Sequence, residues 1–258
     1  MTKKEYKYIY GPVPSWRLGS SLGIDPIATK GKTCSFDCIY CQLGKIKSLT
    51  KRRKAFISAA KIIKEISSLP SIKIDYLTFS GMGEPTLAKN LGQMIKAVKR
   101  IRKEPVAVLT NSSLMHRKDV RKDLGLADLV VAKLDAPTEA LFRKINRPIK
   151  GMKLAEIIKA IKEFKRDYKG KLALQMMFVK ENEKYAGKLA KLAKEIGPDE
   201  VQINTPLRPC AVKPLSKDKI NKIKKHFKGL NVVSVYEKKR KIVKPISNEE
   251  TIKRRGKV

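Results

Sequence analysis

Short apolar runs alternate with amphipathic segments along most of this chain, and the alternation limits the folds that it can adopt. Six segments have the composition of strands, and the middle of each is a nearly continuous apolar run: residues 22–27, 75–80, 105–110, 128–134, 171–179 and 200–205. Such runs are typical of parallel strands that are covered on both faces. Between them, apolar side chains recur at helical spacing, as at Leu154, Ile157, Ile158, Ile161 and Phe164.

Six βα units in succession predict parallel strands that are joined by right-handed crossovers. The fold class is therefore α/β, and we expect a partial (β/α)6 barrel of the TIM type. No Gly-x-Gly-x-x-Gly follows a strand and no Walker-type phosphate loop occurs, which argues against an open dinucleotide-binding sheet. After a helix at 216–227, which Ser216 would cap, we expect one more strand at 231–236 and then a loosely packed basic tail.

Polar residues and glycines follow the carboxyl ends of several of these strands. In β/α barrels those ends share one mouth, where the chemistry takes place. The residues in these positions are three cysteines, a glycine–glutamate turn, and several amides, hydroxyls and charges: Cys34, Cys38, Cys41, Gly81–Pro85, Asn111–Ser113, Lys133–Asp135 and Asn204–Pro206. Any one of them is ordinary in a loop, whereas their combination predicts a functional site at the mouth.

Three of the four cysteines, Cys34, Cys38 and Cys41, lie within eight residues. In a reducing cytosol such a group is typical of metal binding or catalysis rather than of disulfides. A structural zinc would need a distant fourth ligand, because no second cysteine pair or histidine lies nearby. On an iron–sulfur cubane, three thiolates leave one iron open to a substrate or cofactor. Cys210 would close that iron, so we do not expect it to be a ligand.

The Cys-x-x-x-Cys-x-aromatic-Cys loop resembles that of the radical S-adenosylmethionine (radical SAM) enzymes. The resemblance implies that the three cysteines hold a [4Fe–4S] cluster and that S-adenosylmethionine chelates the remaining iron. One electron then cleaves the sulfonium and releases a 5′-deoxyadenosyl radical, which abstracts hydrogen. We call Cys34, Cys38 and Cys41 the loop cysteines.

The same resemblance implies which residues contact S-adenosylmethionine. Tyr40 would line the adenine pocket. The turn formed by Gly81, Met82, Gly83, Glu84 and Pro85 is similar to the family's Gly-Gly-Glu-Pro, in which polar groups receive the methionyl ammonium. The contacts with the ribose, the carboxylate or the substrate would come from side chains after the next two strands: Asn111, Ser113, Lys133 and Asp135.

Further motifs resemble a prokaryotic radical SAM subfamily that is related to the wyosine-base tRNA-modifying enzymes. They are Gly11–Ser15, Arg17–Gly19, Ser21–Gly23, Lys133–Ala136, Ile145–Pro148 and Ile203–Pro206. The resemblance runs from residue 8 to about 230, which we take as the radical SAM core domain, with 231–258 as the extra strand and basic C-terminal tail. It implies an RNA substrate, with a tRNA base as the favoured target.

The charge of the chain agrees with an RNA partner. Lys and Arg total 59 against 24 Asp and Glu, a net charge of +35, and nucleic acid is the commonest polyanion that could offset it. The alternative is a lysine-rich solvated surface without a dedicated partner. We expect Lys51, Arg52, Arg53, Lys54 and Asn204 to contact the substrate, with further basic clusters at 238–241 and 253–255.

The expected function is therefore hydrogen abstraction by a radical SAM enzyme, supplied by a reducing electron donor and directed at RNA. Two alternatives stay open: a radical activase that acts on a protein partner, and a cluster-bearing RNA-binding protein without turnover. No apolar run reaches the ~18 residues that span a bilayer, and none follows the N-terminus, so we expect a cytoplasmic protein without membrane contact.

Overall fold

A computed structural model describes residues 5–237 and 240–255. Its main sheet is curled, and its strands follow one another in the order β1-β2-β5-β6-β7-β8-β9-β10. From β2 onward neighbouring strands are parallel, whereas β1 and β2 form an antiparallel hairpin. The strands are β1 (Ile9–Ser15), β2 (Gly19–Ile24), β5 (Tyr76–Phe79), β6 (Val106–Thr110), β7 (Leu129–Lys133), β8 (Lys171–Met177), β9 (Glu200–Asn204) and β10 (Val232–Ser234).

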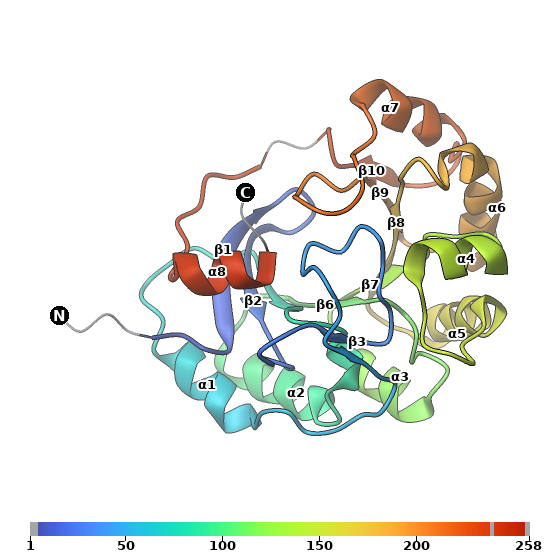
Figure 1. Cartoon of the computed structure of the whole chain (residues 1–258). Helices are drawn as coiled ribbons and strands as arrows, with labels where there is room; N and C mark the ends of the chain where they lie inside the picture. The colour runs from blue at the N-terminus through green and yellow to red at the C-terminus, as the bar shows by residue number, and fades with distance from the viewer. Residues whose placement is uncertain (1–4, 238–239, 256–258) are drawn as a thin grey trace.

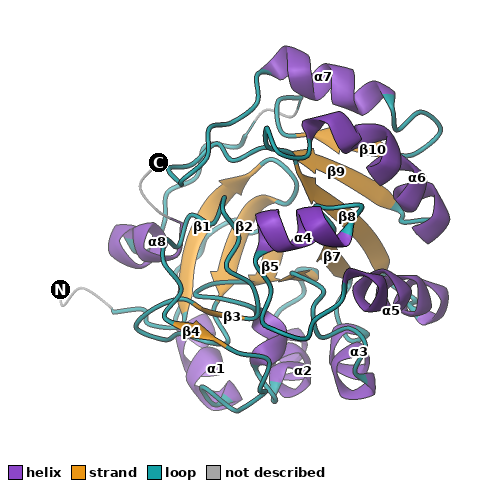
Figure 2. Cartoon of the chain, turned by 45° about the vertical axis from the view of Figure 1, so that its right-hand side comes forward, coloured by secondary structure: helices purple, strands orange, loops and turns teal. Residues whose placement is uncertain are grey.

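Helices cover the outer face of this sheet (Figures 1 and 2). The sheet forms an open barrel, because β1 and β10 lie at its two ends and do not pair, and we call its inner side the lumen. The helices are α1 (Ala59–Ser67), α2 (Leu91–Ile101), α3 (Lys118–Leu124), α4 (Glu139–Asn146), α5 (Leu154–Asp167), α6 (Ala186–Ile196) and α7 (Lys217–Lys225), with 3-10 turns η1 (Pro85–Leu87) and η2 (Glu183–Tyr185). The predicted partial α/β barrel is confirmed. Ser216 caps α7 as expected, because its side chain accepts a hydrogen bond from the Lys219 N–H.

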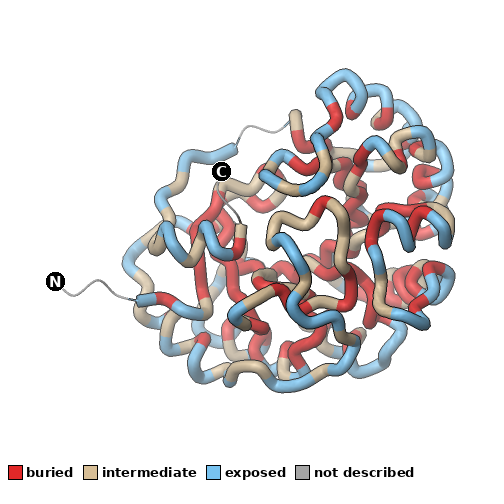
Figure 3. The backbone as a smooth tube through the Cα atoms, viewed as in Figure 1, coloured by how far each residue is buried: buried red, intermediate tan, exposed pale blue. Residues whose placement is uncertain are grey.

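The two faces of the strands have different neighbours, which decides where a site can lie. The outward side chains join the buried core between sheet and helices, the red inner layer of Figure 3. Inside the lumen, five buried apolar residues fill the end near the amino termini of the strands: Leu18, Ala107, Leu129, Val131 and Ala173. Further along, the inward positions become polar, as at Ser21, Thr78 and Gln175, so the carboxyl end of the lumen is the polar end.

Strand β1 was not expected from the sequence. It contains Pro12 and Pro14, and its pairing with β2 is irregular between Tyr10 and Val13. Proline is tolerated at sheet edges and bulges, so an edge strand of this kind lacks the usual strand pattern. Helices α3 and α4 were not predicted from the sequence either.

The C-terminal segment corrects the expectation of a loosely packed tail. Residues Asn248–Arg255 form helix α8, which packs on β1 (Figure 1). The Arg254 side chain is 1% exposed, and its Nε donates to the buried carboxylate of Asp25 at 2.8 Å. Of the predicted basic cluster 238–241, Lys238 and Lys239 lie outside the described residues. No helix among the described residues is long and apolar enough to span a membrane.

Candidate functional site

The loop cysteines lie on a loop that is anchored at the carboxyl ends of the central strands. Cys34 ends the short strand β3 (Thr33–Cys34), which pairs with β4 (Ser48–Leu49). The Thr33 N–H donates to the Met82 carbonyl at 2.9 Å, which ties the loop to the turn after β5. On the other side, the Ile39 N–H donates to the Ile145 carbonyl of α4 at 3.0 Å. The loop therefore spans from β5 to α4 across the mouth.

Two amide side chains contact the cysteine sulfurs. Asn111 Nδ2 lies 3.4 Å from the Cys34 Sγ, and Asn146 Nδ2 lies 3.6 Å from the Cys38 Sγ. Burial raises the pKa of both thiols, that of Cys38 to about 11, so at neutral pH both are protonated until a metal displaces the protons. The fourth cysteine, Cys210, donates instead to the Val212 carbonyl at 3.2 Å.

The glycines after β5 are needed because other groups approach them closely. A Cβ on Gly83 would lie 1.6 Å from the Thr33 carbonyl oxygen, on the strand that carries Cys34. A Cβ on Gly81 would lie 2.2 Å from the Asp25 carboxyl carbon. Any side chain at either position would therefore push the turn away from its neighbours. The Met82 side chain, between the two glycines, is buried.

Glu84 is buried, and its carboxylate joins the turn after β5 to the end of β6. Its Oε1 accepts hydrogen bonds from the Thr86 N–H at 3.1 Å and from the hydroxyls of Thr86 and Thr110 at 2.6 Å, while Oε2 accepts from the Asn111 N–H at 2.7 Å. Burial raises the pKa of Glu84 and these hydrogen bonds oppose the shift. Pro85 follows as the first residue of η1. Oε2 accepts one hydrogen bond here, which leaves it room for another donor.

Tyr40 and Asp135 form one cluster with Asn146 and Lys133. The Tyr40 hydroxyl donates to Asp135 Oδ2, to which Asn146 Nδ2 also donates at 2.8 Å. Lys133 Nζ lies 4.7 Å from the centre of the Tyr40 ring and 3.7 Å from Asp135 Oδ1. Asn146 was not among the predicted site residues; the signal was its place in the Ile145–Pro148 motif.

The remaining predicted cofactor contacts, and Asn204, which was predicted to contact the substrate, also lie at this mouth. Asn111 Nδ2 donates to Ser35 Oγ at 2.9 Å, and the hydroxyls of Ser35 and Ser113 are 2.6 Å apart. Asn204 lies at the end of β9 and lines the lumen. The structure therefore brings together the loop cysteines, the Glu84 turn and the residues after β6 and β7.

The predicted substrate contact at Arg53 is corrected by the structure. The Arg53 side chain is only 4% exposed, and its guanidinium is paired with Asp119 and Asp123. It also donates to the carbonyls of Thr86 and Ala88, so its hydrogen bonds are used inside the protein. Lys51, Arg52 and Lys54 are exposed.

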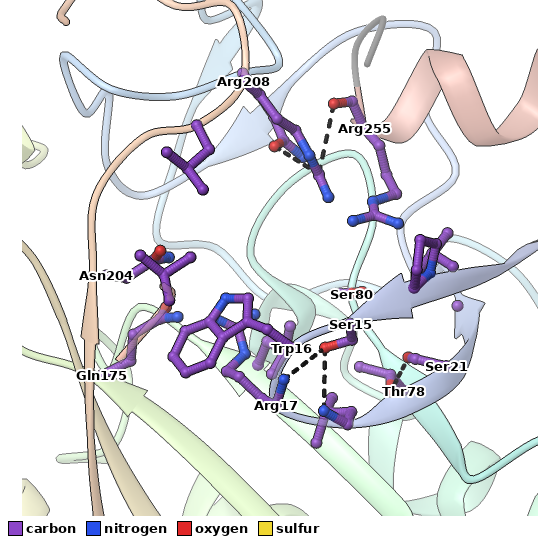
Figure 4. A pocket seen from close by; sticks show the side chains of 18 of the residues that line it. Ser15, Trp16, Arg17, Ser21, Thr78, Ser80, Gln175, Asn204, Arg208 and Arg255 are labelled. Atoms are coloured by element: carbon purple, nitrogen blue, oxygen red, sulfur yellow. Dashed lines mark hydrogen bonds between the residues drawn. The ribbon is translucent and has the colours of Figure 1, made fainter. Parts of the chain in front are cut away.

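A cavity of about 260 Å³ occupies the polar end of the lumen (Figure 4). Tyr40, Ser80 and Gly81 line it, so it reaches the mouth beneath the cysteine loop. Its wall also holds Trp16 and Arg17 from the β1–β2 hairpin, Gln175 from β8, and arginines from the loop after β9 and from the C-terminal segment: Arg208, Arg240, Arg254 and Arg255. Arg17 lies in a motif quoted for the subfamily, and Arg240, Arg254 and Arg255 lie in the predicted basic clusters, but nothing in the sequence placed them in one cavity.

Residues 29–193 match the family model described as the radical SAM superfamily. This chain belongs to that superfamily. It is 42% identical to UPF0026 protein slr1464 of Synechocystis sp. over 211 residues, which are 81% of this chain and 78% of the relative. It is also 42% identical to UPF0026 protein MJ1312 of Methanocaldococcus jannaschii, over 84% of this chain and 68% of the relative.

Solved radical SAM structures share the fold. Streptococcus suis SuiB bound to its precursor peptide SuiA has a TM-score of 0.64 at 17% identity, over 82% of this chain and 48% of SuiB, so this chain spans about half of that protein. The enzyme anSMEcpe with bound AdoMet has a TM-score of 0.61 at 19% identity, over 84% of this chain and 64% of that chain. This radical SAM protein is therefore an enzyme whose cofactors are a [4Fe–4S] cluster and S-adenosylmethionine.

The donor set fits such a cluster. Among residues 5–237 and 240–255, no group of three or more Cys, His, Asp or Glu side chains is placed around a single metal ion. In a cubane each thiolate binds a different iron, so the three thiols need not converge on a single metal ion. Asn111 and Asn146 add N–H donors toward two of the sulfurs, and such donors tune cluster potentials.

Proposed function

We propose that this radical SAM enzyme abstracts hydrogen from a base of RNA, with tRNA in the cytoplasm as the substrate. The observation that carries the proposal is the basic surface beside the cysteine loop. Strand β4 pairs with the strand of Cys34, and Lys51, Arg52 and Lys54 follow it, exposed and next to the loop. This exposed basic cluster, in a chain whose net charge is +35, favours a polyanion at the mouth. The subfamily motifs, which resemble the wyosine-base enzymes, point to the same substrate.

We assign roles to the site residues from the charge, exposure and hydrogen-bonding capacity of their side chains. The loop cysteines hold the irons once deprotonated, and Tyr40 forms a flat wall beside Cys41. Lys133 is one-fifth exposed and places a positive charge where the S-adenosylmethionine carboxylate can bind. Oε2 of Glu84 receives the ammonium, and Gly81 and Gly83 allow the backbone approach that this needs.

When bound, the cluster and S-adenosylmethionine supply a 5′-deoxyadenosyl radical after one-electron reduction by a donor protein or dithionite. The side chains of the protein position the bound groups and exclude water from the site. Asp135 holds the Tyr40 hydroxyl and the Asn146 amide in fixed orientations. Asn111 and Ser113, whose side chains meet at Ser35, orient the ribose and the carboxylate.

The deciding experiment combines a comparison of strains with an assay of the reconstituted enzyme. Nucleosides of total tRNA from a deletion strain are compared with those of the parent by mass spectrometry, and the reconstituted enzyme is then given the unmodified tRNA with dithionite. We expect one nucleoside to disappear in the deletion strain and to reappear in vitro with release of 5′-deoxyadenosine. An unchanged nucleoside profile, with 5′-deoxyadenosine still formed, would remove RNA as the substrate and leave a protein partner as the target.

Salt dependence tests the basic surface separately. A protein that covers ~5 phosphates of a single strand shows log affinity falling with log salt at a slope of about −3.5, at ~0.7 per phosphate. Replacing Lys51, Arg52 and Lys54 by Gln should flatten the slope by about 2. The matched control replaces three exposed lysines of α6: Lys188, Lys191 and Lys194. Equal effects of the two triple variants, or equal competition by heparin and tRNA, would contradict a dedicated RNA surface.

A further inference from the structure

The cavity in the lumen is strongly basic. Five arginines line it, from three distant parts of the chain, and among the described residues that line it there is no Asp or Glu. Figure 4 shows Arg208 and Arg255 in its upper part, with Trp16 and Arg17 below them. Its volume lies near the low end of the range of volumes found for small-molecule sites.

Most of these charges have no carboxylate partner in the described part of the chain. Arg254 is neutralised by Asp25 and Glu250. Arg17, Arg208 and Arg255 have no carboxylate oxygen within 4 Å among the described residues. Arg208 instead donates to the Gln42 side chain at 2.8 Å and to the backbone carbonyl of Arg255 at 3.5 Å, which places two of the arginines next to each other.

Two buried donors of the cavity wall also lack partners. Arg17 Nε and Gln175 Nε2 are buried and make no hydrogen bond within the described protein. A buried donor without a partner is unfavourable, and charged groups cost more than neutral ones. Burial and the charge of Arg255 lower the pKa of Arg17 to about 10, so the wall bears electrostatic repulsion that an anion would relieve.

The shape of the wall narrows the class of anion. Guanidinium groups bind phosphate and carboxylate in paired hydrogen bonds. Trp16 adds a flat aromatic surface, with the Arg17 guanidinium 5.2 Å from its ring centre. Gln175 and Asn204 add amide groups that can read the edge of a base. A nucleotide combines an anionic group with a planar, hydrogen-bonding ring, so it matches the arginines, Trp16 and the amides of this wall.

We propose that this cavity binds one nucleotide unit of the substrate, with its phosphate on Arg17, Arg208 and Arg255 and its base against Trp16. The inference deepens the proposed function and rests on it for the nucleotide's place in an RNA chain. Tyr40 and Gly81 line the same cavity, so the bound nucleotide lies next to the predicted S-adenosylmethionine site.

The test uses the cluster-loaded enzyme after saturation with S-adenosylmethionine. Uridine 5′-monophosphate, uridine and inorganic phosphate are each titrated into it, and binding is measured by calorimetry. We expect the monophosphate to bind at least tenfold more tightly than uridine. Arg17→Gln should weaken it on the order of tenfold, and Arg208→Gln is the second variant if the first does not fold. The matched control is Arg166→Gln, which removes an exposed arginine of α5 that is paired with Asp167; it should leave the affinity unchanged.

Several results would overturn the inference. Equal affinity for uridine and its monophosphate would remove the phosphate contact, and tighter binding of a glutamate-rich peptide would assign the cavity to a protein substrate. If Arg17→Gln weakened S-adenosylmethionine and not the monophosphate, the arginines would serve the cofactor. These results differ from failure of the proposed function, because monophosphate binding without any tRNA product would refute only the RNA substrate.

Discussion

Replacing Arg254 by methionine tests the packing of α8 on the barrel. The substitution keeps most of the side-chain volume but leaves the Asp25 carboxylate buried without its cation. Removing one partner of a buried ion pair costs about 3–5 kcal/mol. Asp25 keeps hydrogen bonds from the N–H groups of Ile27, Ala28 and Met82, so we expect the lower end, about 3 kcal/mol.

Urea unfolding, followed by circular dichroism and by the fluorescence of Trp16, measures this cost. With an m-value of about 3 kcal/mol/M, the midpoint should fall by about 1 M. Arg166→Met is the control, because its ion pair with Asp167 is exposed, and its midpoint should match that of the parent. A shift of less than about 0.2 M for Arg254→Met, or the same shift in both variants, would refute the reasoning.

Three further predictions concern the site. Replacing any loop cysteine by Ser should abolish both the visible absorption of the reconstituted cluster and 5′-deoxyadenosine formation, whereas Cys210→Ser should spare both; loss of the cluster in the Cys210 variant would make that residue a ligand. Glu84→Gln should keep the cluster but weaken S-adenosylmethionine binding by about tenfold, the loss of one charge-assisted hydrogen bond; unchanged affinity in equilibrium dialysis would limit Glu84 to holding the mouth together. Gly83→Ala should displace β3 and lower iron content after reconstitution, since its Cβ would meet the Thr33 carbonyl; full iron content would show that the turn can shift.

The parallel strands were predictable because burial on both faces leaves a mark in each strand separately. The apolar run of β5 or β7 can be read without knowing its neighbours. Strand β1 carries no such mark, because its two prolines suit an edge and its outer partner is a distant segment. Helix α8 reads as a charged tail because its buried side chain is an arginine, Arg254, and the carboxylate that pairs with it, Asp25, is distant in sequence.

The same distinction separates the two halves of the site. The loop cysteines and the Glu84 turn are local motifs, so the sequence displays their spacing directly. The cavity is assembled from residues as far apart as Arg17 and Arg255, and only the docking of the last helix brings them together. The charge of Arg53 is visible in the sequence, whereas its neutralisation by Asp119 and Asp123 depends on the fold.

The contact between β1 and the C-terminal segment has a consequence for solubility. An open barrel, unlike a closed one, leaves edge strands whose free N–H and C=O groups can pair with another molecule. Here the Ile246 N–H donates to the Gly11 carbonyl at 2.6 Å, and the Gly11 N–H donates to the Thr251 hydroxyl at 3.0 Å. The segment thus occupies the edge of β1 that other copies of the chain would otherwise use. A chain cut before Ile246 would expose that edge and form β-sheet aggregates.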